Sequence, residues 1–371
     1  MDFELSDEQA MLRGASRDLL SDHASAPDEV WRLAADLGWP GLAVPEEYGG
    51  TGQGVVELAL VEEELGRFRG PAPFLPTVLV ARALARDGSP RIREEVLPVL
   101  AEGAAWAAWA FAEPRSPWTP DGIRATARTE GDSVVLDGVK TAVQDADGAR
   151  WLLVTACLDS SGGDGGRGGV PVSFLVDRAA PGVTVRRQRS LDLTRTSYEV
   201  RLDGVRVPAE RRLGGGPGAV QRLLDDASVL VAADTLGVMD RLLDMTVSYM
   251  KVRVQFGQPL GSFQAVKHAC ASMAVAVQGT RAATAYAAMA ADAGSSDAAR
   301  AACVAASYAS AAAGEVAGSA LQLHGGIGFT WEHELHLYLR RAKTDAVLYG
   351  DASVHRDRLC TLIRPTHALS A

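Results

Sequence analysis

The sequence predicts an α+β protein in which a β domain separates two helical parts, and two changes in patterning carry this prediction. Residues 1–108 place apolar side chains at helical spacing, residues 109–214 switch to a period of two, and residues 215–371 return to helical spacing. A chain of 371 residues is long enough for two or three domains. We therefore assign one domain to each of these three parts.

The first part predicts helices. Ser6 precedes an amphipathic run over residues 7–20, which begins with two acidic residues where the helix dipole favours anions. A second helix is expected over about 28–37, ending at Gly38, and a third over about 55–67 with apolar residues on one face.

The middle part predicts an antiparallel β domain of short strands, because apolar and polar residues alternate between turn signals. The expected strands are residues 124–128, 133–136, 151–157, 172–176, 183–186 and 198–202. A glycine-rich run over 161–169 is expected to be a flexible loop between two of them.

The third part predicts a tightly packed helical bundle over residues 217–365. Alanine dominates residues 269–320, and alanine is both the best helix former and small enough to let helices approach closely. We expect part of this alanine-rich surface to face another subunit.

Composition limits the class of protein. The net charge is −9 and the sequence pI is about 5.4, which argues against nucleic acid or an anionic membrane surface as the main partner. The N-terminus shows no signal-peptide pattern, and the apolar runs are shorter than the roughly 18 residues that span a bilayer. Four widely spaced cysteines form no CxxC pair, so we expect a reduced, cytoplasmic protein.

Two segments, 253–264 (RVQFGQPLGSFQ) and 322–330 (QLHGGIGFT), carry the most specific pattern. There the sequence resembles the acyl-CoA dehydrogenase family. Four further stretches resemble the family in the right order: 42–52 and 62–67 resemble its opening helices, and 111–114 and 136–140 resemble its β domain. The resemblance covers nearly the whole chain. It implies a middle β-barrel-like domain, a C-terminal four-helix bundle, and FAD-dependent α,β-dehydrogenation of an acyl-CoA thioester.

The residues in the two segments suit a dinucleotide cofactor. Arg253 offers a planar fork for a pyrophosphate, and Phe256 offers a face for adenine or ribose. Gly325 and Gly326 let backbone N–H groups approach a phosphate. The resemblance implies that the adenine-diphosphate half of FAD, seated in the neighbouring subunit, is held by Arg253, Phe256, Gln264, Gln322 and Gly326. A dimer, or a tetramer built as a dimer of dimers, is therefore implied.

The catalytic base, in contrast, has no clear position. The family's usual glutamate falls on Tyr349, and a tyrosine is a poor base at neutral pH. The base position of a minority branch falls on Ala227, with Ser228 where that branch has an arginine. The nearest carboxylates, Asp226 and Asp351, are weak candidates, and each is more simply explained as a solvated or capping residue.

The surroundings of the flavin also depart from the family pattern. Residues 115–121 replace a Gly-x-Gly-Ser-Asp loop, and the family tryptophan that faces the isoalloxazine falls on Ala142. Asp225 matches an acidic position associated with the CoA end of the substrate. Thus the motifs that grip a neighbour's cofactor are present, whereas those that build this chain's own reacting centre are altered.

This asymmetry most resembles the branch that forms α2β2 heterotetramers acting on CoA thioesters of bulky substrates such as sterol side chains. One interpretation is a base-lacking partner subunit in fatty acid or steroid catabolism, with an electron-transfer flavoprotein as electron acceptor. The alternatives are a self-sufficient dehydrogenase with a non-standard base, a flavin-dependent oxidase or monooxygenase, and a structural partner that binds no cofactor.

One other pair of residues could suggest a metal. His333 and His336 are spaced to share one helical face. Because the sequence lacks an HExxH pattern and offers no evident third ligand, we expect no metal site.

Overall fold

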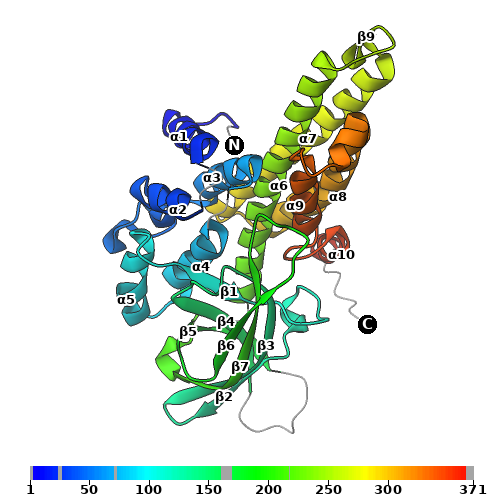
Figure 1. Ribbon diagram of the computed structural model, residues 1–371. Helices are drawn as coiled ribbons and strands as arrows, with labels where there is room; N and C mark the ends of the chain where they lie inside the picture. Colours follow the sequence, from blue (N-terminus) through cyan, green and yellow to red (C-terminus); the bar gives the residue numbers. More distant parts are fainter. Residues whose placement is uncertain (1–2, 24–26, 71–72, 160–168, 217, 365–371) are drawn as a thin grey trace.

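The computed structural model describes residues 3–23, 27–70, 73–159, 169–216 and 218–364, and it confirms the predicted order of helices, strands and helices (Figure 1). The N-terminal helices are α1 (Asp7–His23), α2 (Pro27–Asp36), α3 (Val55–Phe68), α4 (Phe74–Asp87) and α5 (Pro90–Ala101). The strands of the middle part are β1 (Ala107–Ala110), β2 (Thr126–Glu130), β3 (Ser133–Gln144), β4 (Trp151–Leu158), β5 (Val170–Asp177), β6 (Val183–Gln188) and β7 (Ser197–Pro208). The last part contains α6 (Ala219–Val252), β8 (Val254–Gln255), β9 (Gln258–Pro259), α7 (Gln264–Asp292), α8 (Ala298–His324), α9 (Leu335–Asp345) and α10 (Ala352–Ile363).

The β sheet is mixed rather than purely antiparallel, which corrects our expectation. The strand order is β1-β4-β2-β3-β7-β6, with β5 beside β4. β1 and β2 both run parallel to β4, while the remaining pairs are antiparallel. The connections that lead from β1 and β2 to β4 are long enough to return the chain in the same direction. The predicted loop over 161–169 lies, apart from Gly169, outside the described residues.

Several strand boundaries differ from the sequence prediction: β3 and β7 run on to Gln144 and Pro208, beyond the predicted ends at 136 and 202. Differences at two other strands have identifiable reasons. β1 was not predicted, because its sequence (AAWA) has neither β-branched residues nor alternation. β2 begins two residues later than expected, because the backbone N–H groups of Arg124 and Ala125 donate to the Glu113 carboxylate (2.8 and 2.9 Å) instead of to a strand. β2 also ends later, where Glu130 pairs with Ser133 across a tight turn.

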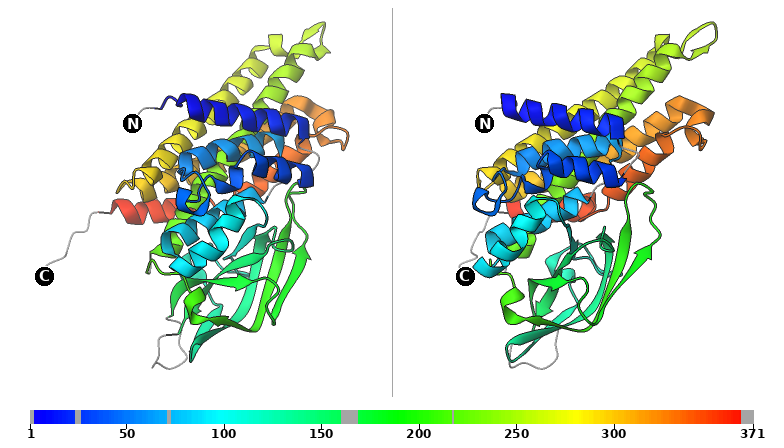
Figure 2. Two further views of the ribbon diagram at one scale, coloured as in Figure 1. Left: turned by 90° about the vertical axis from the view of Figure 1, so that its left-hand side faces the viewer. Right: turned by 60° about the vertical axis from the view of Figure 1, so that its left-hand side comes forward.

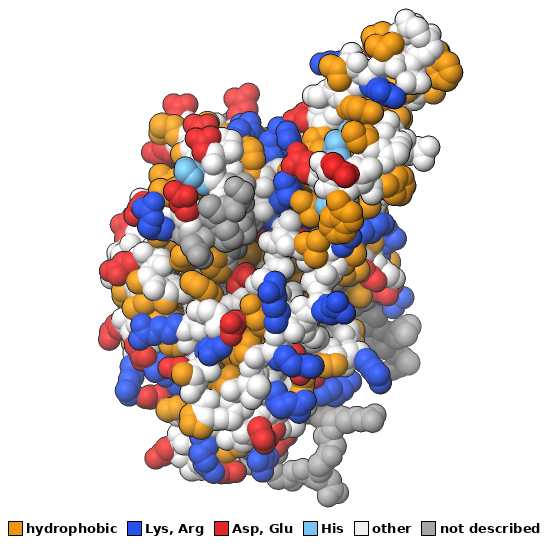
Figure 3. Space-filling model, viewed as in Figure 1, with side chains coloured by type: hydrophobic (Ala, Val, Ile, Leu, Met, Phe, Trp, Pro, Cys, Tyr) orange, Lys and Arg blue, Asp and Glu red, His pale blue; other side chains and the backbone are white. Residues whose placement is uncertain are grey.

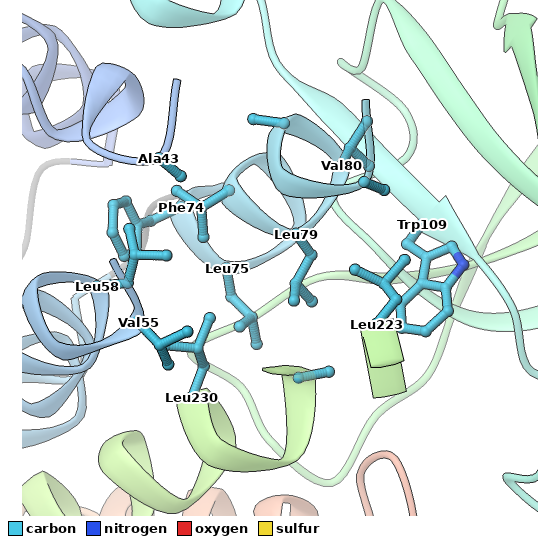
Figure 4. Packing of buried hydrophobic residues seen from close by; sticks show 14 of the residues in the cluster. Ala43, Val55, Leu58, Phe74, Leu75, Leu79, Val80, Trp109, Leu223 and Leu230 are labelled. Carbon is cyan, nitrogen blue, oxygen red and sulfur yellow. The ribbon is translucent and has the colours of Figure 1, made fainter. Parts of the chain in front are cut away.

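The two helical parts are joined by a close crossing of α3 and α6. A side chain on Gly237 of α6 would overlap the carbonyl oxygen of Glu63, and one on Gly66 of α3 would overlap that of Asp234. Such contact of backbone with backbone is possible only for glycine. A hydrophobic core continues from this crossing through α4 to β1, with Leu75 and Leu230 near its centre (Figure 4).

The long helices α6 and α7 extend beyond the rest of the molecule as an arm, with the β8–β9 hairpin at its end (Figures 1 and 2). Within the described part of the chain, no helix is long and apolar enough to cross a membrane.

The start of α3 is capped by a residue distant in sequence. The carboxylate of Asp292, at the end of α7, accepts hydrogen bonds from the backbone N–H groups of Val55 (2.6 Å) and Val56 (2.9 Å). Replacing Asp292 by alanine would leave two helix N-terminal donors unsatisfied, so we expect a loss of about 1–2 kcal/mol in the free energy of unfolding. Urea unfolding measures this. Asp36→Ala, which removes only an exposed ion pair with Arg32, serves as the control, and an equal effect of both variants would contradict the assignment.

Candidate functional site

The hairpin at the end of the arm presents an aromatic ring to solvent. Phe256 and Gly257 form its two-residue turn, and both have positive φ (54° and 80°). A positive φ is costly for a bulky residue and is found where function constrains the backbone. Phe256 is 88% exposed, and its ring lies nearly perpendicular to that of Phe263 (6.1 Å between centroids, 87° between planes). The fold thus holds an aromatic face outward at some cost.

An unpaired guanidinium belongs to the base of the same hairpin. Arg253 is exposed and immediately follows α6, and its carbonyl oxygen accepts the N–H of Leu260 (2.8 Å), which closes the base of the hairpin. Its side chain has no ion pair within the described chain. Gln264, the first residue of α7, is also exposed.

The glycine pair lies at the same end of the molecule. Tyr249, one turn before Arg253, stacks on His324 (4.8 Å between centroids, 7° between planes), which directly precedes Gly325. Gly325 has φ 61° and ψ −140°, a conformation nearly restricted to glycine. A side chain on Gly326 would meet open space, and its φ is not positive, so the fold itself does not require glycine there. A glycine at this position is expected if a group from outside the chain approaches the backbone closely.

These features fit one half of a dinucleotide cofactor: an aromatic face for adenosine, a free guanidinium for a diphosphate, and exposed backbone N–H groups. The six predicted cofactor residues are exposed along this part of the surface: Arg253, Phe256, Gln264, Gln322, Gly325 and Gly326. Figure 3 shows a patch of apolar side chains over the arm. The exposed large apolar residues of the same chain segments are Val252, Val254, Val275, Ile327, Phe329 and Trp331. A monomer rarely exposes so much apolar surface, so the patch indicates contact with another chain.

The position of the family glutamate lies elsewhere, between the β sheet and the helices. Tyr349 is buried and stacks on Trp109 of β1 (5.6 Å, 18°), while Trp118 contacts it edge-on (5.2 Å) and Phe111 completes the cluster. Burial raises the pKa of the Tyr349 phenol well above its ordinary value. It is therefore neutral and cannot accept a proton as a base.

The weak candidate carboxylates are all engaged. Asp226 is buried and accepts from Arg82 (3.1 Å) and Arg86 (2.8 Å) of α4. Asp351 caps α10 and accepts from its first backbone N–H groups, at 2.9 and 3.0 Å. Asp225, the predicted substrate residue, pairs with Arg358 of α10. These arrangements favour structural roles for all three.

The family motif at residues 111–114 forms a buried ion pair. Lys140 Nζ donates to Glu113 Oε1 (2.6 Å) and to the Phe111 carbonyl (3.1 Å), and both side chains are buried. Ala142, at the position of the flavin-facing tryptophan, has φ 52° and donates its N–H to Gln188 (2.9 Å). No aromatic face is therefore offered at this position.

A buried ionic cluster near Tyr349 was not predicted. Arg341 of α9 binds Asp234 of α6 through two nitrogens, at 3.0 Å each. Arg195, from the β6–β7 loop, bridges Asp234 and Asp345. Glu62 of α3 is buried close enough for the charges of both arginines to lower its pKa. A local signal in the sequence was the spacing of Arg341 and Asp345, which lie one turn apart on α9.

Burial raises the pKa of Glu62 to about 7, outweighing the opposite effect of Arg195 and Arg341. Because the folded state then holds this proton more tightly than the unfolded chain, the contribution of Glu62 to stability is complete below about pH 4.5 and is lost as the pH rises to about 7. We expect Glu62→Gln to match the wild type near pH 4.5 and to exceed it by about 1–3 kcal/mol at pH 8. Urea titrations at both pH values test this, and a variant that is less stable at pH 8 contradicts it.

The predicted histidine pair does not share a helical face. His333 precedes α9, and its Nδ1 accepts from the backbone N–H of Leu335 (3.1 Å), whereas His336 lies inside the helix against Trp331.

A cavity of about 300 Å³ lies between α4, β5 and the start of α6, with Leu158, Arg212 and Leu223 among its walls. None of the aromatic residues around Tyr349 lines it. A ligand bound there would therefore not contact that cluster.

The fold agrees with comparisons to known proteins. The N-terminal domain of acyl-CoA dehydrogenases matches residues 6–104, and their C-terminal domain matches residues 214–361. The chain belongs to the acyl-CoA dehydrogenase family, FAD-dependent oxidoreductases that act on CH–CH bonds of acyl-CoA thioesters.

Individual relatives are similar over nearly the whole chain. Acyl-CoA dehydrogenase IpdE2 of Mycolicibacterium smegmatis is 32% identical over 364 residues, covering 93% of this chain and 96% of the relative. The ChsE4–ChsE5 complex from Mycobacterium tuberculosis has a TM-score of 0.88 at 30% identity, covering 97% and 98% of the two chains. The Tcur3481–Tcur3483 steroid ACAD variant has a TM-score of 0.86 at 33% identity, covering 96% and 98%.

Proposed function

We propose that this chain is the base-lacking subunit of a heteromeric acyl-CoA dehydrogenase, which completes the FAD site of a different, catalytic subunit. The observation that carries the proposal is the neutral, stacked Tyr349 at the position of the base, together with an exposed cofactor-gripping surface on the arm. Because of the first feature, this chain lacks a group that could remove the substrate proton. Because of the second feature, it can still bind the FAD of a neighbouring subunit.

Two similar structures support a partnership of unlike chains. One is the ChsE4–ChsE5 complex and the other is a paired steroid ACAD, Tcur3481–Tcur3483. We extend this arrangement to the present chain as an α2β2 tetramer acting on the CoA thioester of a bulky substrate, in fatty acid or steroid catabolism. An electron-transfer flavoprotein would accept the electrons.

In this proposal, bound FAD supplies the hydride acceptor for the oxidation of the acyl chain. Arg253 binds and orients the diphosphate, and Phe256 packs against the adenosine. The backbone at Gly325–Gly326 donates N–H groups, while Gln264 and Gln322 fix the ends of the site. The catalytic base and the thioester site belong to the partner. We do not assign Asp226, Asp351 or Asp225 a role in the reaction.

Coexpression with a homologue that retains the family glutamate tests the proposal. We expect a yellow heterotetramer with one FAD for each pair of unlike chains, and a colourless preparation when this chain is purified alone. A homotetramer filled with FAD that reduces ferricenium with acyl-CoA would overturn it.

The same experiment separates the other interpretations. If the homotetramer is active and either Asp226→Asn or Asp351→Asn abolishes flavin bleaching by substrate, the chain is a self-sufficient dehydrogenase. Oxygen consumption with reduced flavin would indicate an oxidase or monooxygenase. Absence of flavin from every complex would indicate a purely structural partner.

A further inference from the structure

A second cavity, of about 220 Å³, lies on the side of α3 that faces away from the ionic cluster. α1 and the segment before it cover this cavity, and α3, α6 and α7 form its floor. Figure 2 shows α1 lying over α3 and beside α7. Val56, Leu60 and Glu63 of α3 face the cavity, whereas Glu62 lies close to the buried arginines. It is thus separate from the aromatic cluster around Tyr349 and from the exposed cofactor surface.

The floor contains a buried hydroxyl without a partner. Thr284 of α7 is only 3% exposed, and its Oγ1 makes no hydrogen bond within the described structure. One turn earlier, Thr280 donates to the carbonyl of Ala276 (3.0 Å), as threonines within helices commonly do. An unsatisfied buried hydroxyl costs free energy unless something else accepts from it, so Thr284 indicates an acceptor inside the cavity.

The wall also contains a cation without a counter-ion. Arg13 of α1 is half-buried and lines the cavity, and its guanidinium has no ion pair or hydrogen bond in the described chain. The next arginine on this helix, Arg17, is bound to Glu64 through two nitrogens (3.0 and 2.6 Å). The guanidinium of Arg13 is therefore available to an anion at the cavity.

Other polar groups of the wall are already satisfied. Arg281 binds Glu63 and Asp240, so this arginine adds little net charge. Gln9 donates to Glu57 (2.8 Å) and accepts from the N–H of Ser6 (3.1 Å). Glu4 also lines the cavity and has an interaction of its own. The two polar groups of the wall without a partner in the described chain, Arg13 and Thr284, are both donors, and they call for a ligand that carries acceptor oxygens.

The rest of the wall is apolar, with Leu60, Leu236 and Met289 facing the space. The volume is below the roughly 300–1,000 Å³ of typical drug-sized sites, so the ligand is small. We propose that this cavity binds a short aliphatic carboxylate, with its chain between α3, α6 and α7 and its carboxylate at Arg13. Thr284 donates a hydrogen bond to a ligand oxygen or to a water bound with it.

Because the ligand would contact both α1 and α7, it would fasten the first helix to the bundle. The site is independent of the proposed role in FAD binding, since its residues lie on no part of the arm hairpin or the glycine pair. Failure of one proposal therefore leaves the other intact.

Isothermal titration calorimetry of the purified heteromeric complex with octanoate tests the proposal. If no complex forms, the full chain alone is titrated instead. We expect saturable binding at one site per copy of this chain, and much weaker binding of 1-octanol, which lacks the charge. Arg13→Gln should weaken octanoate binding about ten-fold or more, and Thr284→Val about five-fold. Arg32→Gln, which removes an exposed guanidinium from α2, should leave binding unchanged.

Filling the cavity provides a test that does not depend on charge. Ala285→Phe places a ring in the floor and should abolish octanoate binding while the complex keeps its mass and flavin content. Octanoate binding that is unchanged in both Arg13→Gln and Ala285→Phe would overturn the proposal. So would the absence of saturable binding at millimolar octanoate, which would mean that the cavity holds water only.

Discussion

Replacing Asp234 by alanine is expected to lower the free energy of unfolding by about 3–5 kcal/mol, the cost of leaving a buried charge without its partner. Asp234 is fully buried and binds Arg341, which is itself only 1% exposed, through two nitrogens at 3.0 Å each. Arg195 also pairs with Asp234, so the substitution deprives two guanidinium groups of a counter-ion. Urea unfolding of the wild type and the variant measures the loss.

Asp244→Ala is the matched control for this experiment. Asp244 is also on α6 and also pairs with an arginine, Arg67, but its side chain is 52% exposed. Solvent screens such a pair, so we expect a loss below about 1 kcal/mol. If Asp234→Ala costs no more than Asp244→Ala, the cluster does not hold α9 and the β6–β7 loop against α6.

This cluster also shows what the sequence could not reveal. Its members come from α3, α6, α9 and the β6–β7 loop, and no local pattern pairs them, although Asp234 is the lone charge in the apolar stretch 227–239 of α6. Only the tertiary packing shows that Asp234 and Arg341, 107 positions apart, are buried together. The same holds for Asp226, whose partners Arg82 and Arg86 lie on another helix.

Residue spacing predicted the elements whose hydrogen bonds join residues close in sequence better than those that pair with distant strands. The third predicted helix, over about 55–67, corresponds to α3 (Val55–Phe68), because the spacing of its apolar residues is a local signal. That spacing did not indicate that residues 58–66 are all buried, the three glutamates included. The strand over 107–110 was missed because burial on both faces leaves no alternation to detect. Parallel pairing of β1 with β4 could not be predicted either, since it depends on a partner more than forty positions away.

For the proposed cofactor surface, the resemblance named the residues, and the structure shows the backbone conformation and the space around two of them. Phe256 occupies a left-handed turn position that ordinarily favours glycine or asparagine. Gly326 needs no special φ and has open space around it. The stability of the fold therefore explains neither residue type, and such positions are typical of functional sites.

Reversing one charge at this surface should therefore abolish cofactor retention without unfolding the chain. In the assembled complex, Arg253→Glu is expected to weaken FAD binding by about 100-fold or more, because it removes a charge-assisted hydrogen bond and places an anion beside the diphosphate. Arg253 is exposed and has no ion pair in the described chain, so its loss leaves no buried charge behind. Flavin absorbance per complex after gel filtration measures the effect.

Lys251→Glu is the control, because it makes the same charge reversal two positions earlier at a residue that is also exposed. It should retain FAD, and both variants should keep the thermal stability of the isolated chain and the mass of the complex. If Arg253→Glu retains full flavin while Lys251→Glu loses it, the arm binds the cofactor differently from the family pattern. If neither loses flavin, the partner holds FAD unaided and this chain is a structural subunit. Because the partner's own residues are unchanged in every variant, any loss of flavin must come from this chain.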